Sequence, residues 1–344
     1  MSVKAEEKPK KVTIRTVAED AGVSVAAVSK VMRNAYGVSD SLREKVEESI
    51  AKLGYRPSTA ARAMRGKTFT VGVLLIDLAN PFLAPLLRNI SDELETKKFK
   101  MMLAAGESSL QLETALIDQM IDFQLDGLIL ISPRMPGDVL ANYAKQIPMV
   151  IIGHHESATA FDTVNSDDKL GAEIATKALV EAGHRDIWML TLGQTEGEAD
   201  LSSEADDRPS APRENGYRAA MEQAGFAERI KVIASNLTAD TETYDAIIDA
   251  PDRPTAVFAW SDLTAVPFLD RCKARGLRVP EDIAIVGYDN NTLAALEMIN
   301  LSSIDQNTES LARAAVSTLL GRIDGRTNAE HRLITPHLVR RKSS

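Results

Sequence analysis

The fold of the N-terminal part of this chain is decided by residues 12–66, which read VTIRTVAEDAGVSVAAVSKVMRNAYGVSDSLREKVEESIAKLGYRPSTAARAMRG. Apolar residues in this stretch recur every three or four positions, in three short blocks separated by turn residues. This period predicts three helices, over residues 14–21, 25–33 and 40–53. Val28 and Val31 are expected to face the core that the three helices share.

The residues at the ends of these predicted helices support the assignment. Gly22 permits a tight turn between the first two helices, and Gly54 ends the third, because glycine adopts positive φ without strain. Two helices joined by such a turn form a helix-turn-helix motif. Side chains that can cap the three helices precede them: Thr13, Ser24, and Ser39 or Asp40.

The next segment, STAARAMR over residues 58–65, is rich in alanine and stops at Gly66. It has helix propensity, but isolated helices shorter than about 12–15 residues are marginal in water. An additional interaction is therefore needed to order it.

From Thr68 onward the pattern changes to apolar runs that alternate with helical segments. Near-continuous apolar runs of this length are typical of parallel strands that are buried on both faces of a sheet. Alternating strands and helices predict an α/β fold, and this number of strands favours two doubly wound, Rossmann-like lobes over one sheet. The runs are TVGVLLID (70–77), KMMLAAG (100–106), DGLILIS (126–132), MVIIG (149–153), DIWMLTL (186–192), AVFAW (256–260) and DIAIVGY (282–288).

Charge is distributed unevenly along the chain, although the net charge is −9. Residues 1–67 hold 14 Lys and Arg against 8 Asp and Glu, a balance of +6, so the remainder carries −15. A basic head on an acidic body indicates contact with phosphate groups at one end of the protein. A short basic tail without a binding role would give the same balance, so charge alone does not decide.

Composition favours a protein that works inside the cell. The single cysteine, Cys272, can form no intramolecular disulfide, as expected in a reducing compartment. The first residues contain lysines but no apolar segment of a secretory signal, and no apolar run reaches the ~18 residues that span a bilayer. We therefore expect a cytoplasmic protein that makes no membrane contact.

Taken together, residues 12–66 resemble the headpiece of the LacI/GalR family of transcriptional regulators, and the pattern continues to about residue 340. A bare helix-turn-helix is weakly specific, but here the turn, the third helix, the GYRP element and the following segment occur at the family's spacing. The resemblance implies a DNA-binding headpiece (1–57), a hinge helix (58–67) and a periplasmic-binding-protein-like body (68–341) that binds an effector and dimerises. It divides the body into a first lobe (about 68–166 and 305–328) and a second lobe (about 167–304 and 329–341).

The second helix of a helix-turn-helix enters the major groove, and residues near its N-terminus face the base edges. The resemblance gives this role to Val25, Ala26, Ser29 and Lys30, although many relatives carry arginine at the last position. Val25 and Ala26 suit thymine methyl groups and offer no hydrogen bonds. A solvated helix face is the alternative for each. Candidate phosphate contacts, which position the protein without reading sequence, are Thr13, Arg15, Ser24, Arg33 and Tyr55.

For the hinge, the resemblance implies that two such helices of a homodimer pair in the minor groove of operator DNA. An apolar wedge then opens a central base step and kinks the duplex. Met64 occupies the wedge position, where leucine is usual, and Ala61 is small enough to let the backbone lie against the groove. The alternative is that Met64 only packs the two hinge helices together.

An effector cleft is expected at the carboxyl ends of the parallel strands. The family's elements are matched there by NPF (80–82), VNSDD (164–168), Arg213 before Gly216 and Tyr217, GYDN (287–290) and SSIDQ (302–306). Asp168 and Ser261 each replace an asparagine of the family pattern. The candidate effector-binding residues are Asn80, Phe82, Ser132, Asp167, Arg213, Trp260, Ser261, Asp289 and Gln306.

Carboxylates and an arginine in one cleft suit hydrogen bonds to neighbouring hydroxyls, which favours a sugar or polyol as the small-molecule effector. A sugar acid is the alternative, because Arg213 could pair with its carboxylate.

His154 and His155 have no further clustered ligands, so no metal or cofactor is expected. Neither GxxxxGK[ST] nor GxGxxG occurs and no catalytic constellation stands out, so an enzyme is not expected. A sugar-binding protein without a role in transcription would share the body but lack residues 12–66. The acidic segment 193–213 is interpreted as an exposed loop, either a surface insertion or a lid.

Overall fold

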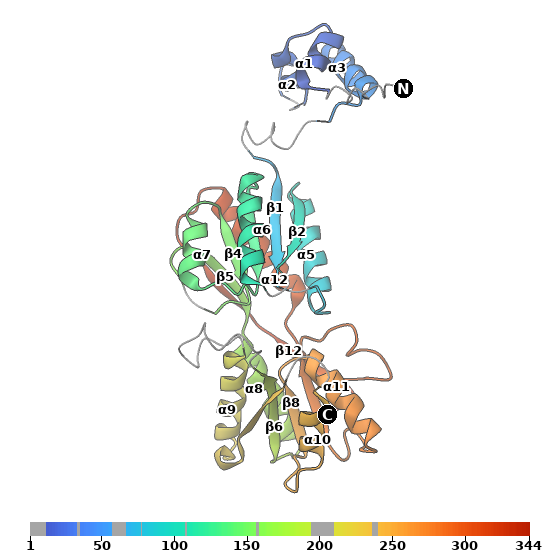
Figure 1. Ribbon diagram of the computed structural model, residues 1–344, viewed down its shortest axis with the longest axis vertical. Helices are drawn as coiled ribbons and strands as arrows, with labels where there is room; N and C mark the ends of the chain where they lie inside the picture. Colours follow the sequence, from blue (N-terminus) through green and yellow to red (C-terminus); the bar gives the residue numbers. More distant parts are fainter. Residues whose placement is uncertain are drawn as a thin grey trace, which may run out of the picture. The chain divides into compact units, whose positions relative to one another are not determined.

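The computed structural model describes residues 12–32, 35–56, 67–76, 78–106, 109–155, 158–193, 210–235 and 240–344. The chain forms two compact units, Met1–Thr68 and Phe69–Ser344 (Figure 1). Each unit has its own hydrophobic core.

The first unit is a three-helix domain of α1 (Ile14–Asp20), α2 (Val25–Met32) and α3 (Asp40–Leu53). One apolar stripe of each helix meets the others in a small core, which includes Val17, Val28 and Val46. This is the arrangement that the helical spacing of these residues predicts. A 2.7 Å ion pair between Lys52 and Asp20 also joins the ends of α3 and α1.

Local side-chain chemistry fixes where these helices begin and end. Thr13 accepts a hydrogen bond from the N–H of Thr16 and so caps α1, and Ser24 does the same for Ala27 in α2. Ser39, rather than Asp40, caps α3 by accepting from the N–H of Leu42. Gly54 ends α3 in the left-handed conformation, with φ of 61°.

The second unit contains two six-stranded sheets, which define two lobes. In the first sheet all neighbouring strands are parallel. Helices α5 (Leu83–Thr96) and α12 (Thr308–Ile323) pack on one face, and α6 (Leu110–Asp122) and α7 (Gly137–Ala144) pack on the other. The strand order is β11 (His331–Ile334), β5 (Asp162–Ser166), β4 (Met149–Ile152), β3 (Gly127–Ile131), β1 (Thr70–Leu75) and β2 (Lys100–Ala105).

The second sheet is parallel except for the pairing of β12 with β10. Helices α8 (Asp168–Glu181) and α9 (Ala211–Gln223) cover one face, and α10 (Thr241–Ile248) and α11 (Asp262–Ala274) cover the other. A short 3-10 helix, η2 (Ala227–Arg229), follows α9. The strand order is β12 (His337–Val339), β10 (Ser302–Asp305), β9 (Ala284–Tyr288), β8 (Ala256–Ala259), β6 (Ile187–Leu192) and β7 (Lys231–Ser235).

The chain crosses between the sheets three times: from β5 to α8, from β10 to α12 and from β11 to β12. The expectation that residues 329–341 belong wholly to the second lobe is wrong, because β11 pairs with β5 of the first sheet. The buried carboxylate of Asp162 explains this placement. It accepts hydrogen bonds from Arg322 and Arg326 at the end of α12 and from the N–H of Glu330, just before β11.

The expectation of two doubly wound lobes is confirmed, and each predicted apolar run forms a strand. The sequence did not single out β5, β7 or β10–β12, because these strands carry polar residues that interrupt an apolar run. Within the described ranges, no helix is both long and apolar enough to cross a membrane.

Candidate functional site

Helix α2 presents the side chains that the sequence assigns to base contacts. Val25 is 39% exposed, Ala26 and Lys30 are exposed, and Ser29 is half-buried. Arg15 is also exposed, on α1, and the exposed Thr13 and Ser24 precede α1 and α2 as their caps. The predictions for Arg33, Ala61 and Met64 fall outside the described residues.

Tyr55 has a different environment from the one expected of a phosphate contact. Its side chain is only 8% exposed and packs in the core of the three-helix unit with Val17 and Val46. Its N–H donates to the carbonyl of Ile50 just beyond the end of α3. The ring therefore contributes to the stability of the three-helix unit, and little of it is exposed for a contact with DNA.

A second candidate site is built around Arg213, at the start of α9 in the second lobe. Its Nε donates to Oδ1 of Asp168 at 3.0 Å, and its Nη1 donates to the carbonyl of Trp260 at 2.7 Å. The guanidinium lies 3.7 Å from the ring centroid of Tyr288 and 4.9 Å from that of Trp260. A buried guanidinium that is held by two hydrogen bonds and two aromatic rings is a fixed positive charge with little freedom to move.

Asp289 lies beside Arg213, directly after β9. Its Oδ1 is 3.8 Å from Nη1 of Arg213 and accepts a hydrogen bond from Gln306, which follows β10. Burial raises the pKa of Asp289 to about 7, although Arg213 and Gln306 lower it. The residue has φ of 103°, which for a side chain other than glycine is strained. The predicted residues Arg213, Asp289, Trp260 and Gln306 are thus brought together at the carboxyl ends of β8, β9 and β10.

The expected carboxylate, Asp167, does not reach this cluster. Its Oδ1 accepts from the N–H of Leu170, so its side chain caps α8. The next residue, Asp168, contacts Arg213 instead, and its Oδ2 lies 3.1 Å from Nε2 of His155. Burial raises the pKa of Asp168, but Arg213 and His155 outweigh it and hold that pKa at about 2.

Three polar side-chain atoms at the ends of β6 and β8 are buried and have no hydrogen-bond partner among the described residues. They are the indole Nε1 of Trp260, Oγ of Ser261 and Oγ1 of Thr191. Asp262, which directly follows Ser261, is also buried, and burial and the neighbouring Asp289 raise its pKa to about 8. Because an unpaired buried donor is costly, such groups mark a place where a polar ligand can bind.

The candidates of the first lobe are placed less favourably than the sequence suggests. Phe82 is 9% exposed and belongs to the core under α5, which leaves little of its ring for stacking on a sugar. Asn80 accepts a hydrogen bond from the N–H of Phe82 in the turn before α5. Ser132 follows β3 with φ of 50°, and its N–H donates to Ile152. No contact between any of these three and the Arg213 cluster is found among the described residues.

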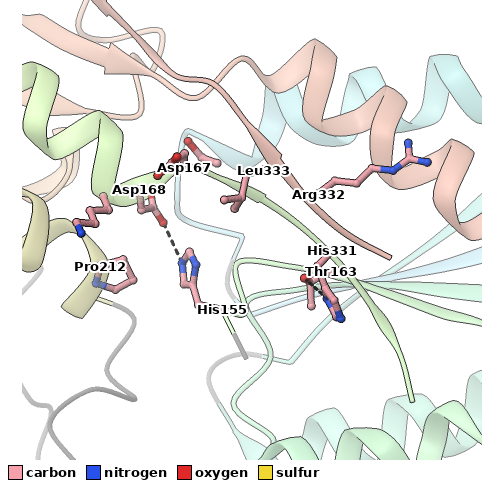
Figure 2. A pocket seen from close by; sticks show the side chains of 10 residues that line it. His155, Thr163, Asp167, Asp168, Pro212, His331, Arg332 and Leu333 are labelled. Atoms are coloured by element: carbon pink, nitrogen blue, oxygen red, sulfur yellow. Dashed lines mark hydrogen bonds and ion pairs between the residues drawn. The ribbon is translucent and has the colours of Figure 1, made fainter. Parts of the chain in front are cut away.

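A pocket of about 390 Å³ opens where β5, β11 and the starts of α8 and α9 meet (Figure 2). His155 and Asp168 face each other across one end of it, and Thr163 and His331 are hydrogen-bonded at the other. The described residues contain no group of three or more His, Cys, Asp or Glu that could hold a metal ion.

Sequence reasoning did not select Asp168, His155, Tyr288 or Asp262 as site residues. Asp168 could have been selected from the sequence, because it stands where the family pattern has asparagine. A buried acid beside Arg213 was therefore foreseeable, whereas the contact with His155 depends on how the two lobes meet.

Comparison with known protein families identifies both units. Residues 13–58 match the family of bacterial regulatory proteins, lacI family, and residues 176–344 match the periplasmic binding protein-like domain. The chain is 30% identical to catabolite control protein A of Priestia megaterium over 338 residues, which cover 97% of this chain and 99% of that protein. The chain belongs to the LacI family.

Two further relatives agree with this assignment. The ribose operon repressor of Escherichia coli (strain K12) is 30% identical over 342 residues, covering 96% of this chain and 99% of that protein. A solved complex of the transcriptional regulator CelR with cellobiose is 30% identical, covers 97% of this chain and 100% of that chain, and superposes with a TM-score of 0.68. This LacI-family protein is thus a DNA-binding transcriptional regulator with a headpiece and an effector-binding body.

Proposed function

We propose that this LacI-family regulator represses transcription as a homodimer bound to an operator, and that a neutral sugar or polyol controls its affinity for DNA. The observation that supports the choice of effector is the group around Arg213, Asp289 and Trp260. It offers, at the carboxyl ends of three strands, a carboxylate, an amide and an indole donor that has no partner among the described residues. Hydroxyl groups, which donate and accept, complement such a set.

The charge of the cluster argues against a sugar acid. Two buried carboxylates, Asp168 and Asp289, share one guanidinium, and Arg213 already donates to Asp168 and to the carbonyl of Trp260. A ligand carboxylate would compete with Asp168 for Arg213 and would face Asp289. A neutral ligand avoids both costs. The relatives agree, because one is named a ribose operon repressor and another was solved with cellobiose.

The headpiece supports an operator that is read largely by shape and by methyl contacts. The exposed end of α2 offers Val25 and Ala26, and Lys30 is its one exposed cation among the described residues. A dimer with two such helices would recognise two half-sites of a near-palindrome.

The exposed side chains of Leu293, Leu296 and Met298 give the second lobe an apolar surface for a second copy. Binding to chromosomal DNA would place the protein in the cytoplasm, and no enzymatic role is proposed.

Truncation separates the two halves of this proposal. The full chain should enrich a near-palindromic sequence from random DNA, and the chain that lacks residues 1–66 should not. Both proteins should show a rise in melting temperature with the same neutral sugar, because a ligand specific to the folded state stabilises it. Specific operator binding by the truncated chain would overturn the role of the headpiece.

A ligand screen tests the effector class. Sugars, polyols and sugar acids are compared by thermal shift, with the variant Arg213→Met as the control for binding in the cleft. A neutral sugar that raises the melting temperature of the native protein only is the expected result. A stronger effect of a sugar acid would overturn the proposal of a neutral effector.

The predicted wedge at Met64 is tested separately. Met64→Gly should weaken operator binding more than non-specific binding, and equal losses would contradict insertion of Met64 into the base step.

A further inference from the structure

The segment 340–344, which follows β12, packs beside β9 and β10 of the second lobe. The N–H of Arg341 donates to Oγ of Ser302 at 2.8 Å, at the start of β10. Further along, Oγ of the buried Ser343 accepts from the N–H of Ser302 and donates to the carbonyl of Ile285 in β9. The N–H of Ile285 donates in turn to the carbonyl of Ser343. These bonds hold the segment in place independently of the Arg341 guanidinium.

The guanidinium of Arg341 reaches the turn that follows β9. Its Nη2 donates to Oδ1 of Asn290 at 2.6 Å, and its Nη1 donates to the carbonyl of Leu301 at 2.6 Å. Asn290 is held on its other side as well, since its Nδ2 donates to Asp305 and its N–H donates to Ser303. A guanidinium can only donate and a carboxylate accepts, so these two partners fix the orientation of the Asn290 amide.

The same turn carries Asp289, the carboxylate of the proposed effector site. Asp289 and Asn290 have φ of 103° and 47°, a backbone conformation that is strained for side chains other than glycine. The N–H of Asp289 donates to the carbonyl of Ile304, and its Oδ1 accepts from Gln306. Because such strain persists only where the surrounding contacts over-determine it, loss of the bond between Arg341 and Asn290 should loosen the turn.

We propose that Arg341 is a positioning residue for Asp289, because its hydrogen bond to Asn290 holds the strained turn after β9. In this turn Oδ1 of Asp289 lies 3.8 Å from Nη1 of Arg213. A looser turn would spread the carboxylate over several positions, so fewer molecules would present it to a ligand. The positioning of Asp289 is a property of the ligand-free protein. Its consequence for effector affinity rests on the proposed function.

Hydrogen exchange of the full chain, followed by NMR without effector or DNA, tests the positioning directly. In Arg341→Met the N–H groups of Asp289 and Asn290 should exchange roughly tenfold faster, the effect of one lost hydrogen bond from a charged group. The N–H of Ile285 should keep its native exchange rate, because Ser343 still holds it.

Arg340→Met is the matched control for the exchange measurement. Arg340 is exposed, and its 3.7 Å pair with the exposed Glu181 lies away from the turn, so its removal should leave every one of these rates unchanged. If exchange at Ile285 in Arg341→Met rose as much as exchange in the turn, the whole segment would have been released. That result, or native exchange rates in the turn, would overturn the proposal.

A binding cycle then tests whether Arg341 acts through Asn290. Asn290→Gly removes the amide but keeps the backbone conformation accessible, because glycine adopts positive φ without strain. Isothermal titration with the neutral sugars ribose and cellobiose should show about tenfold weaker binding for Arg341→Met in the native background. In the Asn290→Gly background, Arg341→Met should cause no further loss.

Equal losses in both backgrounds would show that Arg341 acts through its charge or through Leu301, and they would overturn the proposed route. Native affinity in Arg341→Met would overturn the role of this residue in the effector site. Failure of both sugars to bind the native protein would count against the proposed effector class, whereas the exchange rates decide the positioning of Asp289 without any ligand.

Discussion

Arg213 donates a hydrogen bond from Nε to Oδ1 of Asp168 at 3.0 Å, and both side chains are 9% exposed. The pair joins the start of α9 to the start of α8, the helix that follows the first crossing between the lobes. Its position makes it both a structural element of the second lobe and the fixed charge of the proposed effector site.

Removal of Arg213 should therefore cost stability as well as ligand binding. Arg213→Met leaves Asp168 buried without its partner, and we expect the free energy of unfolding to fall by about 3–5 kcal/mol. Arg213→Met combined with Asp168→Asn should lose less than the sum of the two single changes. Urea denaturation measures each value. Arg229→Met in η2 is the control, since both side chains of the Arg229–Asp186 pair are about half-exposed and the pair should contribute less than about 1 kcal/mol. Additive losses for Arg213 and Asp168 would contradict a direct coupling.

Asp262 should make the body less stable as the pH rises. Burial and Asp289 raise its pKa to about 8, so the folded protein retains a proton that the unfolded chain loses near pH 3.8. Where the folded state binds more protons, stability decreases with increasing pH, here between about pH 4 and pH 8.

Asp262→Asn removes this proton and keeps a carbonyl oxygen for either the N–H of Asn291 or the hydroxyl of Ser303. The variant should lose less melting temperature between pH 5 and pH 8 than the native protein does. Asp270→Asn, on the exposed face of the same helix, should behave like the native protein. The same slope in all three proteins would show that Asp262 does not titrate in this range.

Trp260 is predicted to act on the ligand without supporting the empty protein. Its Nε1 has no partner among the described residues, so Trp260→Phe removes no internal hydrogen bond. We expect an unfolding free energy within about 1 kcal/mol of the native value, and effector binding about tenfold weaker, the effect of one lost hydrogen bond. Isothermal titration with the sugar from the screen measures the affinity. Trp188→Phe, which replaces the indole under Lys231 by a phenyl ring, is the control and should leave affinity unchanged. Native affinity in Trp260→Phe would place the ligand away from this indole.

Arg15 and Val25 should affect DNA binding in different ways. Arg15→Ala removes a proposed phosphate contact, so it should weaken binding to operator and to random DNA equally and lower the salt slope of the binding constant by about 1. Val25→Ser should instead change the preferred base at the position of a thymine methyl group. Binding assays at several salt concentrations, together with selection from random DNA, separate the two. Lys45→Ala is the control, because it removes one positive charge from α3, away from α2. If Lys45→Ala also lowered the salt slope by about 1, the phosphate contact proposed for Arg15 would be contradicted.

The sequence was sufficient for the parts of this protein that local patterns encode. The spacing of apolar residues, the caps Thr13 and Ser24, and Gly54 specify the three helices of the headpiece, because each signal acts within one helical turn. The apolar runs of the body likewise predict parallel strands, since burial on both faces leaves a continuous run.

Other features depend on residues that are distant in the chain, and these only the tertiary structure decided. No local pattern shows that β11 returns to the first sheet, because that depends on Asp162 binding arginines more than 150 residues away. Nor does it show that Asp167 caps a helix while Asp168 meets Arg213, because neighbouring side chains at a helix start point in different directions. Phe82 illustrates the same limit: the aromatic expected in the cleft lies in the core under α5, since burial is set by the packing of whole elements.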